Sequence, residues 1–250
     1  MKRYLSLIFI IALTVIIAGC GGSSSADKYG VGKEIKIAEE VTAEELLALV
    51  EEAQENIENT TKVSINLVAK GEITEDGKTE KQTGEAKIVL DYSNPEDGKV
   101  QVNYETTMGK EKVSIDLYAL DGYTYMHEVN EEGEEKYKYP SEYGVETGYV
   151  SSLIMIVDEI LSAVDDLIEE ASFGKDKDGN IIIQSSEKLD DEYNNEYRLV
   201  IKDGLVQYAY IESGEEDYCQ KFIFTFNYKD VKFDFPKNFD GYIDATEEEE

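Results

Sequence analysis

Cysteine is scarce in this chain: its 250 residues include only Cys20 and Cys219. Cys20 has no nearby partner for a disulfide or a metal site, and no Cys-x-x-Cys pair occurs. We therefore expect no intramolecular disulfide. Cys219 falls in the strand-like segment DYCQKFIFTFNY, where a packed small residue is a better interpretation than a nucleophile.

Histidine occurs once, at position 127. No spacing around it supports a Ser-His-Asp triad or a two-histidine zinc centre, and HEVNE at 127–131 lacks the second histidine of a zincin helix. The sequence also has no Gly-x-Ser-x-Gly elbow and no phosphate-binding glycine loop. We expect His127 to be an ordinary strand or surface residue, and we expect no catalytic residue, cofactor or enzymatic activity.

Positive charge is also scarce, with 24 Lys and Arg against 55 Asp and Glu, a net charge of -31. Nucleic-acid binding rewards basic surfaces, so nucleic acid is not an expected partner. Anionic lipid head groups would repel this surface as well. With so many acids, adjacent carboxylates arise by abundance and carry no information about a glycosidase-type pair.

The N-terminus has the layout of an export signal. Lys2 and Arg3 precede an apolar run over 5–18, which is shorter than the ~20 residues of a membrane-spanning helix. Ile17-Ala18-Gly19-Cys20 resembles the lipobox of prokaryotic lipoproteins, which implies cleavage before Cys20 and a diacylglyceryl thioether on its sulfur. We expect a signal peptide over 1–19, then the lipidated cysteine and a flexible tether over 20–40. The alternative is an ordinary signal peptide or an uncleaved anchor.

Two segments show helical periodicity. Thr42 and Glu45 form a capping box in front of an apolar stripe, which predicts a helix over 42–59. The second helix is expected over 149–171, where the first half is apolar nearly all round, as in a deeply buried element.

Elsewhere the apolar pattern alternates with period two, separated by turn signals such as Asp121-Gly122 and Asp178-Gly179. Successive strands with short turns form antiparallel meanders, and no βαβ rhythm suggests a nucleotide fold. We predict an α+β fold in which a strongly curved antiparallel sheet, an open half-barrel, covers two main helices. It would form a single domain over 41–243, followed by an acidic tail over 244–250.

The element order over 42–243, with the stretches VSIDLYALDGYTYMHEV and EEKYKYP, resembles the LolA/LolB-like lipoprotein-carrier fold. The resemblance implies an incomplete antiparallel barrel closed by helices, an apolar cavity and a role in carrying or sensing lipids or lipidated proteins. A soluble carrier is not lipidated, so this chain is more similar to the membrane-bound acceptors and lipid-binding lipoproteins. The family contacts its cargo through an apolar lining, so no ligand-contacting residue transfers by motif.

Two sets of residues are candidate sites. The first set resembles the oxygen ligands of an EF-hand loop and consists of Asp176, Asp178 and Asn180, with Glu187 at the twelfth position. Ile181, however, occupies the position at which that loop needs glycine. An Asp-Gly hairpin turn is the simpler interpretation. The second set is a group of apolar side chains that line a ligand cavity or pack as ordinary core: Leu153, Ile154, Val157, Leu161, Phe222, Phe224 and Phe226.

These patterns predict a membrane-anchored extracytoplasmic lipoprotein that holds a lipid, acyl chain or other apolar ligand. It would sit on the outer side of the cell membrane through its lipid anchor. The alternative is a non-enzymatic structural or sensor protein of the cell envelope, with a filled core and a protein partner.

Overall fold

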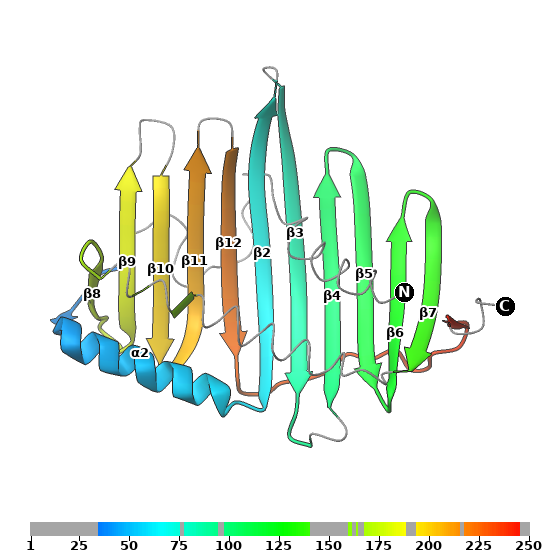
Figure 1. Cartoon of the computed structure of the whole chain (residues 1–250), viewed down its shortest axis with the longest axis horizontal. Coiled ribbons are helices and arrows are strands. Elements are labelled where there is room, and N and C mark those ends of the chain that lie inside the picture. The colour runs from blue at the N-terminus through cyan, green and yellow to red at the C-terminus, as the bar shows by residue number, and fades with distance from the viewer. Residues whose placement is uncertain are drawn as a thin grey trace.

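A single broad sheet dominates the computed structural model, which describes residues 35–75, 78–94, 98–140, 160–161, 164, 168–188, 194–215 and 218–245 (Figure 1). Within these residues the chain has one complete helix, α2 (Ala43–Glu58), and one thirteen-stranded sheet. The strands are β1 (Glu39–Glu40), β2 (Lys62–Glu75), β3 (Lys78–Asp91), β4 (Lys99–Met108), β5 (Glu111–Leu120), β6 (Tyr123–Asn130), β7 (Gly133–Pro140), β8 (Ser172–Lys175), β9 (Ile181–Lys188), β10 (Asn194–Lys202), β11 (Leu205–Glu215), β12 (Tyr218–Asn227) and β13 (Ile243–Asp244).

The sheet consists of two meanders joined side by side. Its order is β1-β8-β9-β10-β11-β12-β2-β3-β4-β5-β6-β7-β13, so β8 to β12 form one half and β2 to β7 the other. The antiparallel pairing of β12 with β2 joins the halves, as Figure 1 shows at the centre of the sheet. The sheet is open, because β1 and β13 at its two edges are not paired with each other.

Tight turns connect the strands where the sequence places Asp-Gly pairs. Asp121 and Gly122 between β5 and β6 both have positive φ, 52° and 75°. Asp203 and Gly204 between β10 and β11 do the same, with φ of 53° and 68°. Two consecutive residues with positive φ characterise the type I′ turn, whose twist matches that of the flanking strands. The antiparallel meander predicted from these turns is confirmed.

One strand pair differs from the expected antiparallel arrangement. The two-residue strand β13 pairs with β7 in parallel, Ile243 opposite Tyr137 and Asp244 opposite Lys138. A short hairpin can join only antiparallel strands, whereas β13 reaches the edge of β7 after a long return of the chain from the end of β12, which permits parallel pairing. The expectation of a wholly antiparallel sheet was therefore wrong at this edge.

Helix α2 begins at the predicted capping box. The Glu45 N–H donates to the Thr42 hydroxyl (3.2 Å), and the Glu45 carboxylate accepts from the Thr42 N–H (2.8 Å). The hydrogen bond from the Thr42 backbone, then that from its hydroxyl, lowers the pKa of Glu45. One stripe of the helix is buried against the sheet: Leu46, Val50, Ala53 and Ile57.

The far end of α2 rests on the turn between β10 and β11. Asn56 Nδ2 donates to the Gly204 carbonyl oxygen at 2.9 Å. A Cβ at Gly204 would lie 2.5 Å from that same Nδ2 atom and 3.1 Å from Glu52 Oε1. Glycine suits this position because of its positive φ, and a larger residue would displace the ends of the Asn56 and Glu52 side chains.

The second expected helix, 149–171, falls largely outside the described residues. Ile160, Leu161 and Val164 are described; they are helical and buried in the same core cluster as the α2 stripe. Residues 168–170 form a turn, so a helix cannot continue to 171. The described residues therefore contain one complete helix rather than the two that we expected. The expectation that the sheet curves strongly around two helices stays a prediction.

Both boundaries of the folded domain differ from those expected. The predicted tether over 20–40 includes residues of the sheet, because Glu39 and Glu40 pair with Lys175 and Gly174 of β8. At the other end, the Ala245 N–H donates to the Lys138 carbonyl at 3.0 Å, inside the expected tail. Sequence composition alone marked these segments as polar linkers, but backbone pairing with an existing sheet edge orders them.

We predict that Leu46→Ala lowers the free energy of unfolding by about 3 kcal/mol, because it leaves a cavity between α2 and the sheet. Leu46 is 0% exposed, whereas the adjacent Leu47 is 41% exposed. Leu47→Ala is the matched control and should change stability by less than about 0.5 kcal/mol. Urea unfolding of both variants checks this, and equal losses would contradict the assigned helix orientation.

Candidate apolar ligand face

The two faces of the sheet differ in character, and β12 illustrates the difference. Side chains alternate along a strand, so Phe222, Phe224 and Phe226 share one face while Ile223 and Thr225 lie on the other. Phe226 belongs to the core cluster that contains the α2 stripe. We call this side of the sheet the helix face and the opposite side the outer face.

A row of aromatic rings runs along β12 and just beyond it on the helix face. Ring centroids are 6.4 Å apart for Phe222–Phe224, 6.3 Å for Phe224–Phe226 and 6.4 Å for Phe226–Tyr228, with all three pairs stacked. Phe226 is only 3% exposed, but Phe222 and Phe224 are half-buried. Burial therefore decreases along the row, away from the core next to α2.

The apolar surface continues across five strands from Phe224. Pairing register aligns one residue from each of the strands β12, β2, β3, β4 and β5, namely Phe224, Leu67, Ala86, Tyr104 and Ile115. We call this set the Phe224 row. Phe224 and Val102 contact both this region and the core next to α2, so the two are continuous. The row becomes polar at β6, where Glu128 lies opposite Ile115.

Of the seven predicted lining residues, the described structure brings together four. Leu161 and Phe226 belong to the closed core cluster, with Leu161 0% exposed. Phe222 and Phe224 lie at the half-buried end of the aromatic row. Leu153, Ile154 and Val157, like the predicted lipidation residue Cys20, lie outside the described residues.

Sequence reasoning missed Leu67, Ala86, Tyr104 and Ile115 as neighbours of Phe224. Alternation identified the strands that hold Leu67, Tyr104 and Ile115 but not β3, which holds Ala86, and only the pairing of β12 with β2 brings Phe224 beside them.

The outer face is covered at both ends by terminal segments. Near the N-terminus, the Ile35 N–H donates to Gln184 Oε1 and Gln184 Nε2 donates to the Ile35 carbonyl, each at 2.9 Å. Near the C-terminus, the Asp234 N–H donates to Gln101 Oε1 at 2.7 Å. Phe239 then stacks on Tyr125 with ring centroids 4.0 Å apart.

Polar side chains also cross the outer face. Asn103 Nδ2 donates to Asp116 Oδ1 at 2.7 Å, and His127 lies between Asp116 (3.6 Å) and Glu134 (3.1 Å). His127 is therefore a half-buried strand residue, in agreement with the sequence.

A charged cluster occupies the outer face of the other half-sheet. Arg198 pairs with Glu196 at 2.7 Å, and Lys221 pairs with Glu212 at 2.9 Å. Burial raises the pKa of Glu196, although the Arg198 charge opposes this rise. The Arg198 guanidinium lies 6.0 Å from the centre of the Tyr210 ring, which suits a cation–π contact. The outer face also holds a buried apolar cluster, so these polar networks lie beside apolar core there: Ile182, Val200, Tyr208, Tyr210 and Ile223.

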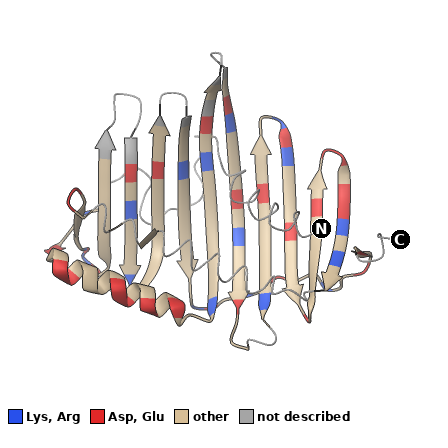
Figure 2. Ribbon diagram, viewed as in Figure 1, with Lys and Arg blue, Asp and Glu red and all other residues tan. Residues whose placement is uncertain are grey.

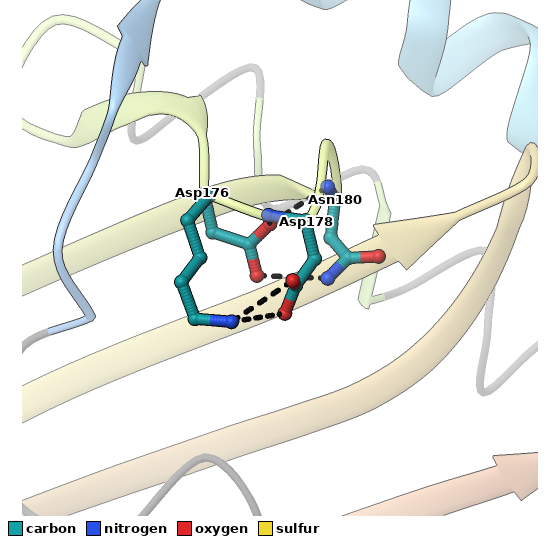
Figure 3. A network of polar contacts seen from close by, with 4 residues as sticks. Asp176, Asp178 and Asn180 are labelled. Atoms are coloured by element: carbon teal, nitrogen blue, oxygen red, sulfur yellow. Dashed lines mark hydrogen bonds and ion pairs between the residues drawn. The ribbon is translucent and has the colours of Figure 1, made fainter.

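The candidate metal ligands Asp176, Asp178 and Asn180 form the hairpin turn between β8 and β9 (Figure 3). Asp176 Oδ1 accepts from the backbone N–H groups of Asp178 (2.8 Å) and Asn180 (2.9 Å), and Asp176 Oδ2 accepts from Asn180 Nδ2 (2.7 Å). The Asp178 carboxylate accepts from Lys177 Nζ at 2.9 Å. Among the described residues, no group of three or more His, Cys, Asp and Glu is arranged to hold a metal ion.

Negative charge is concentrated on the solvent side of α2. Glu44, Glu51, Glu55 and Glu58 are exposed there, and no basic residue occurs in the last turn (Figure 2). In the part of the chain that the structure describes, no helix is long and apolar enough to span a bilayer.

Comparison with known proteins finds no similar sequence and only distant structural matches. No family model matches the sequence, and no curated protein is significantly similar to it. Among solved structures, LprF from Mycobacterium bovis is similar with a TM-score of 0.38 and 9% identity, over 78% of this chain and 97% of LprF. A DUF1329 family protein from Desulfovibrio piger is similar with a TM-score of 0.26 and 12% identity, over 75% of this chain and 95% of that protein.

The environment of Asp176 predicts that the stability of the fold depends on pH. Burial works to raise its pKa, but the hydrogen bonds from Asn180 and Asp178 outweigh this effect and leave the pKa below its ordinary value. A depressed pKa in the folded state stabilises the fold above about pH 4, and this contribution is lost as the pH falls through the folded-state value. Asp176→Ala should therefore lower stability at pH 7, by an amount that shrinks below about pH 4.

Denaturant unfolding between pH 3 and pH 7 measures this difference. Asp178→Ala is the control, because its ion pair with the exposed Lys177 contributes little. A pH-independent loss in Asp176→Ala would contradict the role given to the carboxylate.

Proposed function

We propose that this chain is a lipid-anchored extracytoplasmic protein that binds an apolar acyl chain on the helix face of its sheet. The observation that carries the proposal is the Phe224 row together with half-buried Phe222, an apolar surface continuous with the core but less buried than it. Covering such surface with an acyl chain is favourable by about 25 cal/mol per Å² of apolar area, before the costs of binding.

The distribution of polar groups supports this choice of face. On the outer face, ion pairs and the two terminal segments already contact many of the side chains that strands β4 to β6 and β9 to β12 present. The helix face offers aromatic and aliphatic side chains in register across five strands. The apolar cluster of the outer face, which includes Tyr208 and Tyr210, is almost completely buried, whereas Phe222 and Phe224 on the helix face are half-buried and better placed to receive an apolar ligand.

The anchor supports the proposed location. Ile17-Ala18-Gly19-Cys20 has the lipobox pattern, and the residues between Cys20 and Ile35 are rich in Gly and Ser. A chain attached in this way stays next to the membrane, where acyl chains are available, while its large excess of acidic residues keeps the protein surface away from anionic head groups. The proposal involves no nucleic acid and assigns no catalytic step.

A second candidate is an interaction protein of the cell envelope that has a filled core and no lipid ligand. The observation in its favour is the tight core beneath α2, where Leu161, Val164 and Leu199 are completely buried. The two candidates differ in whether lipid accompanies the purified protein.

We predict that Phe224→Ala lowers the amount of lipid that co-purifies with the full-length protein severalfold, because the substitution removes a large apolar contact at the less buried end of the row. Thr225→Ala is the matched control, since Thr225 is the next residue on the strand but lies exposed on the outer face. Lipid extraction and mass spectrometry measure the lipid-to-protein ratio. An absence of lipid from the wild type would favour the second candidate.

The anchor gives a separate prediction. Wild-type protein should incorporate a metabolically supplied alkyne fatty acid, and Cys20→Ser should abolish this labelling because no thiol remains at the lipobox. Cys219→Ser is the control and should be labelled normally, since Cys219 lies half-buried in β12. Labelling that persists in Cys20→Ser would overturn the proposed anchor.

A further inference from the structure

Tyr104 on β4 holds a buried polar atom inside the apolar helix face. Its side chain belongs to a cluster with Leu67 and Ala69, and the residue is only 8% exposed. Its hydroxyl is buried and has no hydrogen-bond partner among the described residues. Native proteins pair nearly all buried polar groups, so an unpaired hydroxyl calls for an explanation.

The neighbours of Tyr104 do not supply the missing partner. Ala86 and Ile115, its register partners on β3 and β5, are apolar, and the ring lies over Gly84, with ordinary van der Waals spacing to a Cβ at that position. The nearby Thr106 hydroxyl donates to the Thr83 carbonyl oxygen at 3.1 Å. Although Thr106 lies close enough to affect the Tyr104 hydroxyl, no described group meets the geometry of a hydrogen bond to it, so its O–H is left to donate to an incoming acceptor.

Burial keeps this hydroxyl protonated. Desolvation raises the pKa of Tyr104, and a side-chain hydrogen-bonding interaction with the nearby Thr106, which falls outside the geometry of a full hydrogen bond, lowers it by less. Tyr104 is therefore a neutral O–H group that can donate a hydrogen bond to an acceptor on a ligand.

The charges near Tyr104 select the kind of acceptor. On strands β12, β2, β3, β4 and β5, the Phe224 row contains no Lys, Arg or His, and neither do the two neighbouring rows on the same face, which start from Phe222 and Phe226. The nearest charged residue on the row is Glu128 of β6, opposite Ile115, and it is acidic. Burying the carboxylate of a fatty acid without a cation costs free energy, and repulsion from Glu128 adds to that cost. A neutral carbonyl group on the ligand avoids both penalties.

We propose that the helix face binds a neutral acyl ester, whose ester carbonyl oxygen accepts a hydrogen bond from the Tyr104 hydroxyl while its hydrocarbon chain covers Phe222 and Phe224. This inference rests on the proposed function and adds the chemical class of the ligand. The ester oxygen accepts from the unpaired Tyr104 hydroxyl, and the chain covers the half-buried apolar side chains Phe222 and Phe224.

The test is a competition between an ester and an ether. Full-length protein in a nonionic ether-linked detergent is mixed with equimolar 1-monolauroylglycerol and 1-O-dodecylglycerol, which differ in the carbonyl. Native mass spectrometry then gives the ratio of the two bound forms in one sample. The wild type should prefer the ester about fivefold to tenfold, and Tyr104→Phe should bring the ratio close to one.

Tyr228→Phe is the matched control. Its hydroxyl donates to the Val206 carbonyl at 2.8 Å, so this variant loses a hydrogen bond within the protein. It should unfold at lower denaturant concentration yet keep the ester preference, whereas Tyr104→Phe should not be destabilised, since its hydroxyl has no partner to lose.

The outcomes separate the inference from the proposed function. Equal binding of ester and ether by the wild type, or an ester preference that survives Tyr104→Phe, overturns the role of Tyr104 and leaves apolar-chain binding intact. Stronger binding of laurate than of the ester in a parallel competition overturns the neutral-ester class. If neither glycerol lipid binds, the proposed function itself fails, and the inference fails with it.

Discussion

The pairing of β2 with β12 is the constraint on which the rest of the structure depends. These strands are far apart in sequence, yet they join two local meanders into one sheet. Their register sets Phe224 beside Leu67, and through Leu67 beside Ala86, Tyr104 and Ile115. A slip of one residue would move Phe224 to the outer face and interrupt the apolar row. The candidate site is thus a consequence of a long-range strand pair rather than of any local motif.

The two faces of the sheet are stabilised by different contacts. The outer face is stabilised by polar contacts and by both terminal segments, anchored at Gln184 and Gln101. The helix face is apolar, closed beneath α2 and less buried toward Phe222 and Phe224. Acidic residues are frequent along α2, and charged residues are also spread over many of the strands (Figure 2).

Local patterns in the sequence were sufficient to predict helix α2, the Asp-Gly hairpin turns and the apolar faces of several strands. The Thr42–Glu45 capping box and the Asp121-Gly122 turn formed as predicted, because their geometry depends only on neighbouring residues. The edge pairings of Glu39–Glu40 and β13, and the isolated hydroxyl of Tyr104, depend on segments distant in sequence. The oxygen-rich series at Asp176 resembled an EF-hand, but its side chains close a hairpin turn on themselves.

The central claim is that an acyl chain lies on the helix face, and tryptophan fluorescence tests it most directly. The natural sequence has no tryptophan, so Phe224→Trp creates a unique reporter on the helix face and Thr225→Trp creates one on the outer face. A lipid with a brominated acyl chain quenches only nearby indole rings. The account predicts strong, saturable quenching of the residue 224 reporter and little quenching of the residue 225 reporter. Equal quenching at the two positions, or none at residue 224, would contradict it.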